Sequence, residues 1–412
     1  MEHLPGRLPR MAALLALVFG LAGCASAQAD PAPEDPWGPW CELWRFSAGG
    51  RITASPAVDD AHLYVASWDH HLYALDRSTG RPVWKTELTA RTLAPLTLHA
   101  GMLAVSNAHQ TLYLVRAADG TITRELETGW WFPEQAPDIA GDHLAAVSNK
   151  GQVTMWSIAE KDGRPGGNEA WTQELGGAPV GPPMVCGTTV WTLDRFFGFR
   201  GWALADGATR KLEGGPAAYP HQALRVGDRA VVLYSGGVRW FDLETGKVVS
   251  TRELGADYPP PVALAVTDAG AAVVWCGDSW VLWLDAEPRK GLTGIEALEV
   301  DTPPALTAGG ADEAADPKAE SPARSYVWTA DGEQGVLWAS ASGKGGVVHE
   351  RPRKSSAGVI PAAKLEFASP VTLIHRPRPD LLVIGLEDGT LIAYTRGRKD
   401  GGGPEGKTTT GK

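Results

Sequence analysis

The chain has 412 residues, of which 43% are hydrophobic and 21% are charged, a balance that is typical of folded proteins and excludes a disordered chain. Its net charge of -10 argues against nucleic acid as a partner, because nucleic-acid binding requires a cationic face. The 49 Gly and 31 Pro residues, the short apolar runs and the lack of long helical periodicity after the N-terminus predict an all-β fold.

Residues 1–23 have the form of a secretory signal peptide. Two arginines precede the apolar stretch Met11–Ala22, which is too short to span a bilayer, since a spanning helix takes about 20 apolar residues. The segment that follows, Leu21–Cys24, resembles the lipobox of bacterial lipoproteins and implies that Cys24 is lipidated. The alternative is an ordinary signal cleaved near Ala25–Ala27, in which case Cys24 is discarded. By resemblance to the sorting pattern of Gram-negative lipoproteins, the mature protein is expected in the cell envelope, at the outer membrane and facing the periplasm.

Residues 24–40 are rich in proline and predict an extended tether between the lipid and the folded body. The three cysteines beyond it, Cys41, Cys186 and Cys276, are scattered and odd in number, so they do not form a disulfide framework. Cys186 and Cys276 lie in apolar runs and are expected to be buried, although a bridge from Cys41 to either of them stays open.

A repeat of about 40 residues begins after the tether. In the first copy, apolar runs at Ser55–Val58, Leu63–Ser67 and Leu72–Asp76 predict three short strands, and a fourth strand opens on Trp84. Weaker copies follow along the chain, with their paired apolar runs at Leu103–Ser106 and Leu112–Val115, Leu144–Ser148 and Val153–Trp156, Val190–Leu193 and Gly201–Leu204, Val231–Tyr234 and Val238–Asp242, Val273–Cys276 and Val281–Asp285, Tyr326–Trp328 and Gly335–Trp338, and Leu382–Gly385 and Leu391–Tyr394.

Eight such units, each of about 46 residues, predict a β-propeller over residues 41–395. A glycine permits the tight turn before the outer strand, and a tryptophan can wedge between neighbouring blades. These structural roles are assigned to Trp44, Trp84, Trp171, Gly80 and Gly246.

Three segments interrupt this pattern or end it. Residues 307–324 form a low-complexity loop inside the seventh unit, so that a seven-bladed ring is the alternative to an eight-bladed one. Lys344–Gly358 is predicted to be irregular. Residues 396–412 are polar and glycine-rich and are expected to be a disordered tail.

The first copy resembles the pyrrolo-quinoline-quinone-type (PQQ-like) propeller repeat, through the pattern Ala-x-Asp-x-x-Thr-Gly-x-x-x-Trp over Ala74–Trp84. The resemblance extends from Trp44 to about Tyr394 and implies an eight-bladed propeller, in which the N-terminal strand Cys41–Phe46 completes the last blade. The order of lipobox, tether and propeller resembles the lipid-anchored propeller that assists outer-membrane β-barrel assembly.

The sequence lacks the residues that a quinoprotein dehydrogenase needs for catalysis. Quinoprotein dehydrogenases with this repeat are longer, and they use an adjacent cysteine pair and an acidic calcium site, neither of which can be matched here. No catalytic residue and no cofactor are therefore expected. Asp69, His70 and His71 could suggest a metal site, but neighbouring residues of a strand face opposite sides, so that a turn with His70 in the place of a glycine is favoured and no metal is expected.

Two aromatic segments are candidates for binding a partner protein, because aromatic residues with arginine are enriched at interface hot spots. The first is predicted in a loop that crosses the top face between two blades, and it contains Trp130, Trp131 and Phe132. The second is predicted in the turn between the second and third strands of the fourth unit, and it contains Arg195, Phe196, Phe197 and Phe199. Trp68 is a weaker candidate. The structural alternative for both is that their rings cover a seam or plug the channel.

The sequence thus predicts a monomeric, non-catalytic propeller scaffold that binds envelope or outer-membrane proteins and contacts the membrane through its lipid anchor. A PQQ-dependent oxidoreductase and a cell-wall or carbohydrate binder are the alternatives.

Overall fold

The computed structural model describes residues 39–128, 135–159, 168–195, 198–210, 220–255, 258, 261–266, 272–276, 280–284, 295–299, 327–329, 336–342, 345–351, 363–378 and 380–397. Within these residues every regular element is a β-strand, and the strands form four-stranded antiparallel sheets. The all-β expectation is therefore confirmed. No helix long and apolar enough to cross a membrane was found in the part of the chain that the structure describes.

Eight sheets are built from the described strands, and seven of them use four strands that are consecutive in the chain. Sheets 1 to 4 consist of β2 (Ala57–Val58), β3 (His62–Ser67), β4 (His71–Asp76) and β5 (Pro82–Glu87); β6 (Thr97–His99), β7 (Met102–Ser106), β8 (Thr111–Arg116) and β9 (Ile122–Glu127); β10 (Asp138–Ala140), β11 (His143–Val147), β12 (Gln152–Ser157) and β13 (Asn168–Glu174); and β14 (Met184–Cys186), β15 (Thr189–Asp194), β16 (Gly198–Ala203) and β17 (Thr209–Arg210).

Sheets 5 to 7 continue the same order in the second half of the chain. They consist of β18 (Pro220–Val226), β19 (Arg229–Tyr234), β20 (Gly237–Asp242) and β21 (Val248–Glu253); β22 (Pro261–Val266), β23 (Ala272–Cys276), β24 (Trp280–Leu284) and β25 (Ile295–Glu299); and β26 (Val327–Thr329), β27 (Val336–Ser342), β28 (Gly345–Arg351) and β29 (Ala363–Phe367). β28 corrects the expectation of an irregular stretch at Lys344–Gly358. Gly346 permits this strand, because a Cβ there would lie 2.8 Å from Val371 Cγ2 in the neighbouring sheet.

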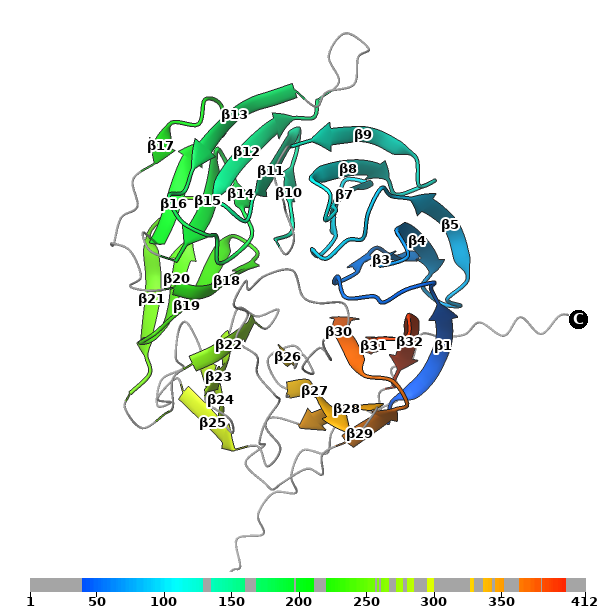
Figure 1. Ribbon diagram of the computed structural model, residues 1–412. Coiled ribbons are helices and arrows are strands. Elements are labelled where there is room, and N and C mark those ends of the chain that lie inside the picture. Colours follow the sequence, from blue (N-terminus) through cyan, green and yellow to red (C-terminus); the bar gives the residue numbers. More distant parts are fainter. Residues whose placement is uncertain are drawn as a thin grey trace, which may run out of the picture.

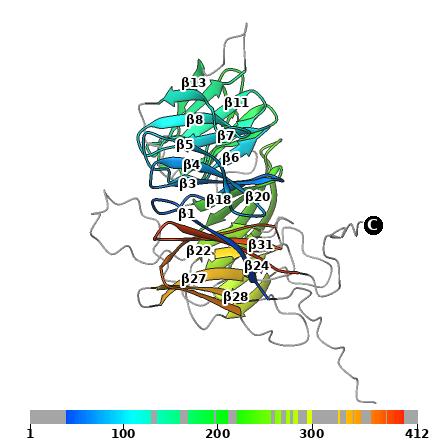
Figure 2. The ribbon, with the colours of Figure 1, turned by 90° about the vertical axis from the view of Figure 1, so that its right-hand side faces the viewer.

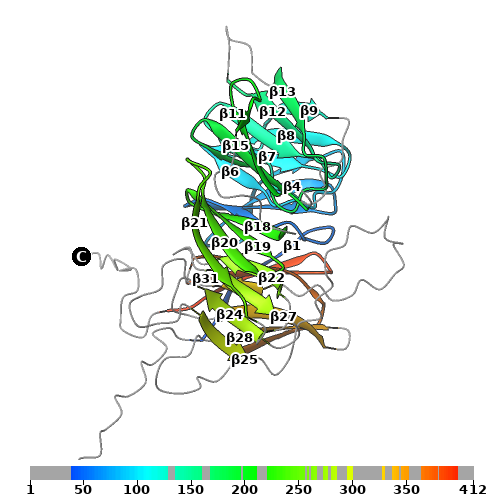
Figure 3. The same cartoon turned by 90° about the vertical axis from the view of Figure 1, so that its left-hand side faces the viewer.

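Sheet 8 joins the two ends of the chain. The first strand, β1 (Cys41–Ser47), pairs in antiparallel register with the last strand, β32 (Thr390–Thr395). On its other side β32 pairs with β31 (Leu381–Leu386), which in turn pairs with β30 (Val371–Arg378). The sheets follow one another around a common centre, with β1 beside β32 (Figure 1). The side views place sheets 1 to 3 above and sheets 6 to 8 below, with β18, β20 and β1 between them (Figures 2 and 3).

Both faces of a sheet are buried, as the alternation of side chains along a strand requires. In β3, Leu63 and Val65 pack against sheet 8, whereas Tyr64 and Ala66 pack against sheet 2. Similar apolar clusters lie between most consecutive sheets among the described residues, and β22 and β26 are neighbours where sheets 6 and 7 meet. The packing thus stacks each sheet on the next, as in a β-propeller.

We call the contact between two neighbouring sheets a seam. At three seams a tryptophan of one sheet forms the same hydrogen bond to the next sheet. The indole nitrogen of Trp44 donates a hydrogen bond to the carbonyl oxygen of Arg77 in the next sheet, at 2.8 Å. Trp84 donates to Ala117 and Trp171 to Leu204, each at 2.9 Å. In each case a glycine three residues after the acceptor lies under the ring and has a positive φ, and these glycines are Gly80, Gly120 and Gly207.

The seam between sheets 4 and 5 uses a different strand. Trp191, in the second strand of sheet 4, donates to the Leu243 carbonyl at 2.5 Å, and its ring lies on Gly246. Gly246 has the predicted place in a turn, but its tryptophan was not recognised in the sequence. The reason is that Trp191 does not stand on the outer strand, from which the other three seams are formed.

Three of the outer strands contain a β-bulge at the residue before the position that Trp44 occupies in β1. β1, β5 and β21 each contain a β-bulge, at Leu43, Val83 and Val249. These are the large hydrophobic side chains that are most exposed among the described residues. Bulges of this kind hinder the edge of a sheet from pairing with another chain.

Trp40 and Arg396, which flank the predicted propeller at residues 41–395, pack together against the body. Trp40 donates from its indole nitrogen to Glu350 at 2.9 Å, and Arg396 forms an ion pair with the same carboxylate at 3.0 Å. The guanidinium carbon of Arg396 lies 4.4 Å from the Trp40 ring centre, and that of Arg376 lies 5.2 Å from it. The last residue of the predicted tether and the first of the predicted tail therefore meet at one site.

Candidate interaction site

Two of the predicted partner-binding residues, Trp68 and Arg195, lie at the same end of their sheets. Strands alternate in direction, so the turn between the second and third strands lies at the same end as the connection from a fourth strand to the next sheet. We call this end the crossover face. Trp68, which follows β3, and Arg195, which follows β15, lie at this face because each comes after the second strand of its sheet. Among the candidates, Trp130, Trp131, Phe132, Phe196 and Phe197 lie outside the described residues.

Trp68 is an aromatic residue that the structure describes at this face, in the turn between β3 and β4. The guanidinium carbon of Arg51 lies 5.2 Å from its ring centre and that of Arg91 lies 4.5 Å from it, both within the range of cation–π attraction. The indole nitrogen donates to Thr53 Oγ1 at 2.9 Å. The ring is therefore held at the junction of sheets 1 and 2 between two cationic groups, and we call these three residues the Arg-Trp-Arg cluster.

The repeat itself places the two arginines. Arg51 and Arg91 occupy the same position in the similar segments RITASPAV and RTLAPLTL, which precede β2 and β6. The carbonyl oxygen of Arg51 accepts a hydrogen bond from the Trp68 amide at 2.8 Å, and that of Arg91 accepts one from the Ala108 amide at 2.9 Å. Equivalent backbone bonds in two neighbouring copies therefore bring both side chains to the one tryptophan.

The two arginines differ in how their charge is balanced. Arg51 forms an ion pair with Glu387, which belongs to the turn between β31 and β32. Arg91 is exposed, and in the described part of the chain it forms no ion pair with a carboxylate. The Arg-Trp-Arg cluster thus presents a flat apolar ring together with one cation that is available to a partner.

The turn that carries Trp68 is rigid because Asp69 ties it to the neighbouring loop. Asp69 Oδ2 accepts hydrogen bonds from the Gly49 amide at 2.8 Å and from the Tyr73 hydroxyl at 2.5 Å. Burial acts to raise the pKa of Asp69, but the hydrogen bonds from Tyr73 and Gly49 outweigh it, so the pKa is lowered and the carboxylate stays ionised.

The neighbouring histidines serve the same turn. His70 has a φ of 65° and stands where other copies have a glycine of positive φ, such as Gly151 and Gly389. His71 Nδ1 lies 2.7 Å from the carbonyl oxygen of Asp69. The turn geometry favoured from the sequence is therefore present, and the described residues contain no group of three or more His, Cys, Asp or Glu that could hold a metal ion.

The second aromatic segment divides into a surface part and a core part. Arg195 is exposed, and its charge adds to burial in lowering the pKa of the nearby His221. Phe199 corrects the prediction: it is 4% exposed and stacks between Trp191 and Phe241, with ring centres at 5.1 and 4.9 Å. It follows Gly198 at the start of β16, where alternation turns its ring into the seam between sheets 4 and 5. Phe199 is thus a core residue and not a partner contact.

The three described cysteines are free. Cys276 is fully buried, Cys186 is half-buried, and Cys41 is exposed at the start of β1. The possible bridge from Cys41 to either of the others is therefore not formed.

Comparison with known proteins supports the fold. Residues 41–129 match the family model described as outer membrane protein assembly factor BamB. The crystal structure of BamB from Moraxella catarrhalis is similar with a TM-score of 0.57 at 13% identity, over 87% of this chain and 100% of that chain. The computationally designed Ika8 protein is similar with a TM-score of 0.58 at 15% identity, over 86% of this chain and 99% of that chain. At such identities the two structures show a shared fold, and a comparison with curated protein sequences finds no match.

Proposed function

We propose that this chain, which carries the PQQ-like propeller repeat, is a non-catalytic scaffold that binds another protein of the cell envelope through its crossover face. The Arg-Trp-Arg cluster is the observation that carries this proposal. An indole flanked by guanidinium groups has the composition of an interface hot spot and can accept carboxylates, main-chain carbonyls and aromatic rings. The partner surface is therefore expected to be acidic.

The eight sheets support the finer proposal of one closed ring of eight blades. In such a ring the pairing of β1 with β32 joins the last blade to the first. A closed ring holds its loops in fixed relative positions, because the sheets pack on their neighbours on both sides. Arg91 and Arg195, which belong to different sheets, would then present one continuous binding surface.

The location proposed for the scaffold is the periplasmic side of the outer membrane. This rests on the lipobox at Cys24 and on a tether, residues 24–40, that would reach about 50 Å when extended. A role in the assembly of outer-membrane proteins is supported by the family model that residues 41–129 match. Mass spectrometry of the mature N-terminus tests the anchor, and an unmodified chain that begins after Cys24 would contradict it.

Site-specific photocrosslinking in cells tests the binding face. A photoreactive residue at position 91 or 195 should yield a crosslinked envelope protein, whereas the same residue at position 116 should not. Arg116 is also an exposed arginine, paired with Asp119, but it ends β8 at the opposite face. Equal yields at all three positions would contradict the assignment of the crossover face.

Two substitutions then test the cluster itself. Arg91→Glu and Trp68→Ala should lower co-purification of the crosslinked protein by about tenfold, because a central hot-spot residue is worth 1.4 kcal/mol or more. Arg116→Glu is the matched control and should leave it unchanged. Unchanged recovery with Arg91→Glu would sink the proposal. Dye reduction by the purified protein after addition of quinone and calcium would contradict its non-catalytic part.

A further inference from the structure

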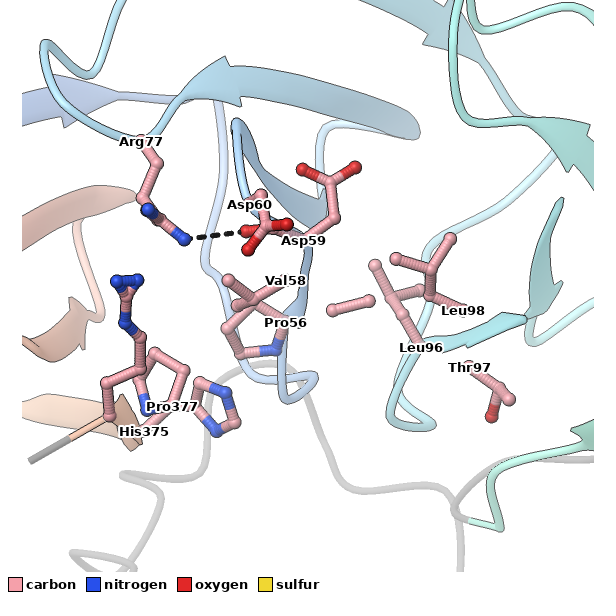
Figure 4. Close-up of a pocket in the computed structure, with 12 residues that line it drawn as sticks. Pro56, Val58, Asp59, Asp60, Arg77, Leu96, Thr97, Leu98, His375 and Pro377 are labelled. Atoms are coloured by element: carbon pink, nitrogen blue, oxygen red, sulfur yellow. Dashed lines mark hydrogen bonds between the residues drawn. The ribbon is translucent and has the colours of Figure 1, made fainter. Parts of the chain in front are cut away.

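A pocket of about 650 Å³ lies at the face opposite the crossover face, where three consecutive sheets present their first strands. Its walls come from β30, β2 and β6 and from the turns beside them. Figure 4 shows Val58 and Pro56 at the centre, with His375 and Pro377 on one side of them and Leu96 and Leu98 on the other. Arg77, Asp59 and Asp60 lie above them in this view. The volume is within the range of sites for small molecules, which is about 300–1,000 Å³.

The carboxylate of Asp59 is occupied within its own turn. Its Oδ1 accepts hydrogen bonds from the amides of Ala61, at 2.8 Å, and His62, at 2.6 Å. Its Oδ2 accepts one from the Tyr64 hydroxyl at 2.7 Å. Burial acts to raise the pKa of Asp59, but these hydrogen bonds outweigh it and lower the pKa. Asp59 therefore shapes the turn and is not free to bind a cationic ligand.

Arg77 is held at the rim by the same turn. One terminal nitrogen donates to the Asp59 carbonyl oxygen at 2.8 Å, as the dashed line in Figure 4 marks. The backbone carbonyl of Arg77 is also the acceptor of the Trp44 indole, so the seam fixes the position of this residue from both sides. A guanidinium has five N–H donors in a planar fork, and this geometry leaves further donors for a ligand.

A second guanidinium group and a neutral histidine complete the polar part of the pocket wall. Arg378 is only loosely paired with Asp380, at 3.9 Å, and its side chain is 42% exposed. Burial lowers the pKa of His375 to about 4, so its imidazole is uncharged at neutral pH. Asp60 is exposed to solvent, where its charge is screened. The pocket thus holds the guanidinium groups of Arg77 and Arg378, which can donate hydrogen bonds to an anionic ligand, beside the carboxylates of Asp59 and Asp60.

The rest of the wall is apolar. Leu96 and Ala57 are buried, and Leu98, Val58 and Pro377 are half-buried around the same space. A ligand that fits must therefore carry an apolar group beside its charged group, because apolar surface removed from water is stabilising.

We propose that this pocket binds an amphiphilic carboxylate, whose carboxylate pairs with Arg77 and Arg378 and whose apolar group packs against Leu96 and Leu98. Arginine forks match carboxylates in geometry as well as in charge. Such a ligand has two sources, a free organic acid or the C-terminal residue of a polypeptide. The site is independent of the crossover face, which lies at the other end of the sheets.

Isothermal titration of the purified full chain with N-acetyl-leucine and with N-acetyl-leucine amide tests the proposal. The acid should bind at least about tenfold more tightly than the amide, because the amide cannot form a charged pair with arginine. Arg77→Gln and Arg378→Gln should each remove this preference. Arg81→Gln should not, because Arg81 is an exposed arginine of the same turn that does not line the pocket.

Two further measurements complete the design. A five-residue peptide that ends in a free leucine carboxylate separates the sources: tighter binding than N-acetyl-leucine indicates a polypeptide C-terminus, and equal binding indicates a small acid. Thermal unfolding of each variant shows that the body is intact. Equal affinity for acid and amide, no binding of either, or an acid preference that survives both arginine substitutions in folded protein would overturn the proposal.

Discussion

The indole ring of Trp44 lies directly on Gly80 of the neighbouring sheet, so closely that a Cβ on Gly80 would come within 2.5 Å of Trp44 Cδ2. The same relationship recurs between Trp84 and Gly120, at 2.6 Å from the ring. At each seam, a glycine with positive φ gives the turn its shape and also leaves room for the indole.

Gly80→Ala should destabilise the protein by about 3 kcal/mol, because the methyl group adds a steric clash with Trp44 to the strain of a positive φ. Gly101→Ala is the matched control: its φ is also positive, at 78°, but nothing lies within 4 Å of the added Cβ. It should cost about 1 kcal/mol. Urea unfolding measures both values, and equal losses in the free energy of unfolding would show that the contact between Gly80 and the Trp44 ring does not add to the cost.

The seam hydrogen bond can be isolated within sheet 3. Trp171→Phe removes the donor to the Leu204 carbonyl, whereas Trp156→Phe removes a similarly buried indole whose nitrogen has no partner among the described residues. Both changes lose ring volume. Trp171→Phe should cost about 1 kcal/mol more in the free energy of unfolding, since it leaves a carbonyl without its donor. Equal costs for the two substitutions would show that the hydrogen bond of Trp171 does not contribute and that packing alone stabilises the seam.

The stability of the protein should fall below pH 6.5 because of His375. Its pKa is about 4 in the folded state against 6.5 for an ordinary histidine, so the unfolded chain takes up a proton at a pH where the folded protein does not. The penalty is absent above pH 6.5, grows as the pH falls, and is complete near pH 4, at up to about 3 kcal/mol.

The His375→Gln variant isolates this contribution from those of other groups. Urea unfolding of both proteins between pH 4 and 7 should give a stability difference that changes with pH in this window and is level above it. A constant difference would show that His375 is accessible to protons in the folded state.

Thiol labelling should separate Cys41 from Cys276. Burial raises the pKa of Cys276 to about 12, so at pH 8 only about one thiol in ten thousand is ionised, and the side chain is also fully enclosed. Iodoacetamide should therefore modify the exposed Cys41 in the native protein and Cys276 only after unfolding. Peptide mass spectrometry identifies the modified residues, with Cys41→Ser as control. Rapid native modification of Cys276 would contradict its burial.

The strands could be predicted where the repeat is well kept. The runs Leu63–Ser67 and Leu72–Asp76 correspond closely to β3 and β4, because alternation and turn residues agree there. Phe199 was misassigned because an aromatic run beside arginines has the same composition in a surface loop and at the start of a buried strand. Only the register of β16 distinguishes the two.

The candidate sites were less accessible to sequence reasoning. Trp68 stood out as an aromatic residue in a turn, but its arginines come from two different repeats and meet through backbone bonds that no local pattern reveals. The opposite pocket joins Asp59 and Arg77 to His375, which is near the other end of the chain. Its position depends on the packing of sheet 8 against sheet 1, and this packing is a property of the whole fold.

The pairing of β1 with β32 also constrains how the protein can be made. A chain that is synthesised from its N-terminus delivers β1 first, and β1 must wait for its partner until the last strand has been made. During that interval the edge of β1 is unpaired, and this favours association with other chains. A chain that is cut short before Thr390 never obtains this partner. Such products should be more open to proteolysis, so that mainly full-length molecules accumulate.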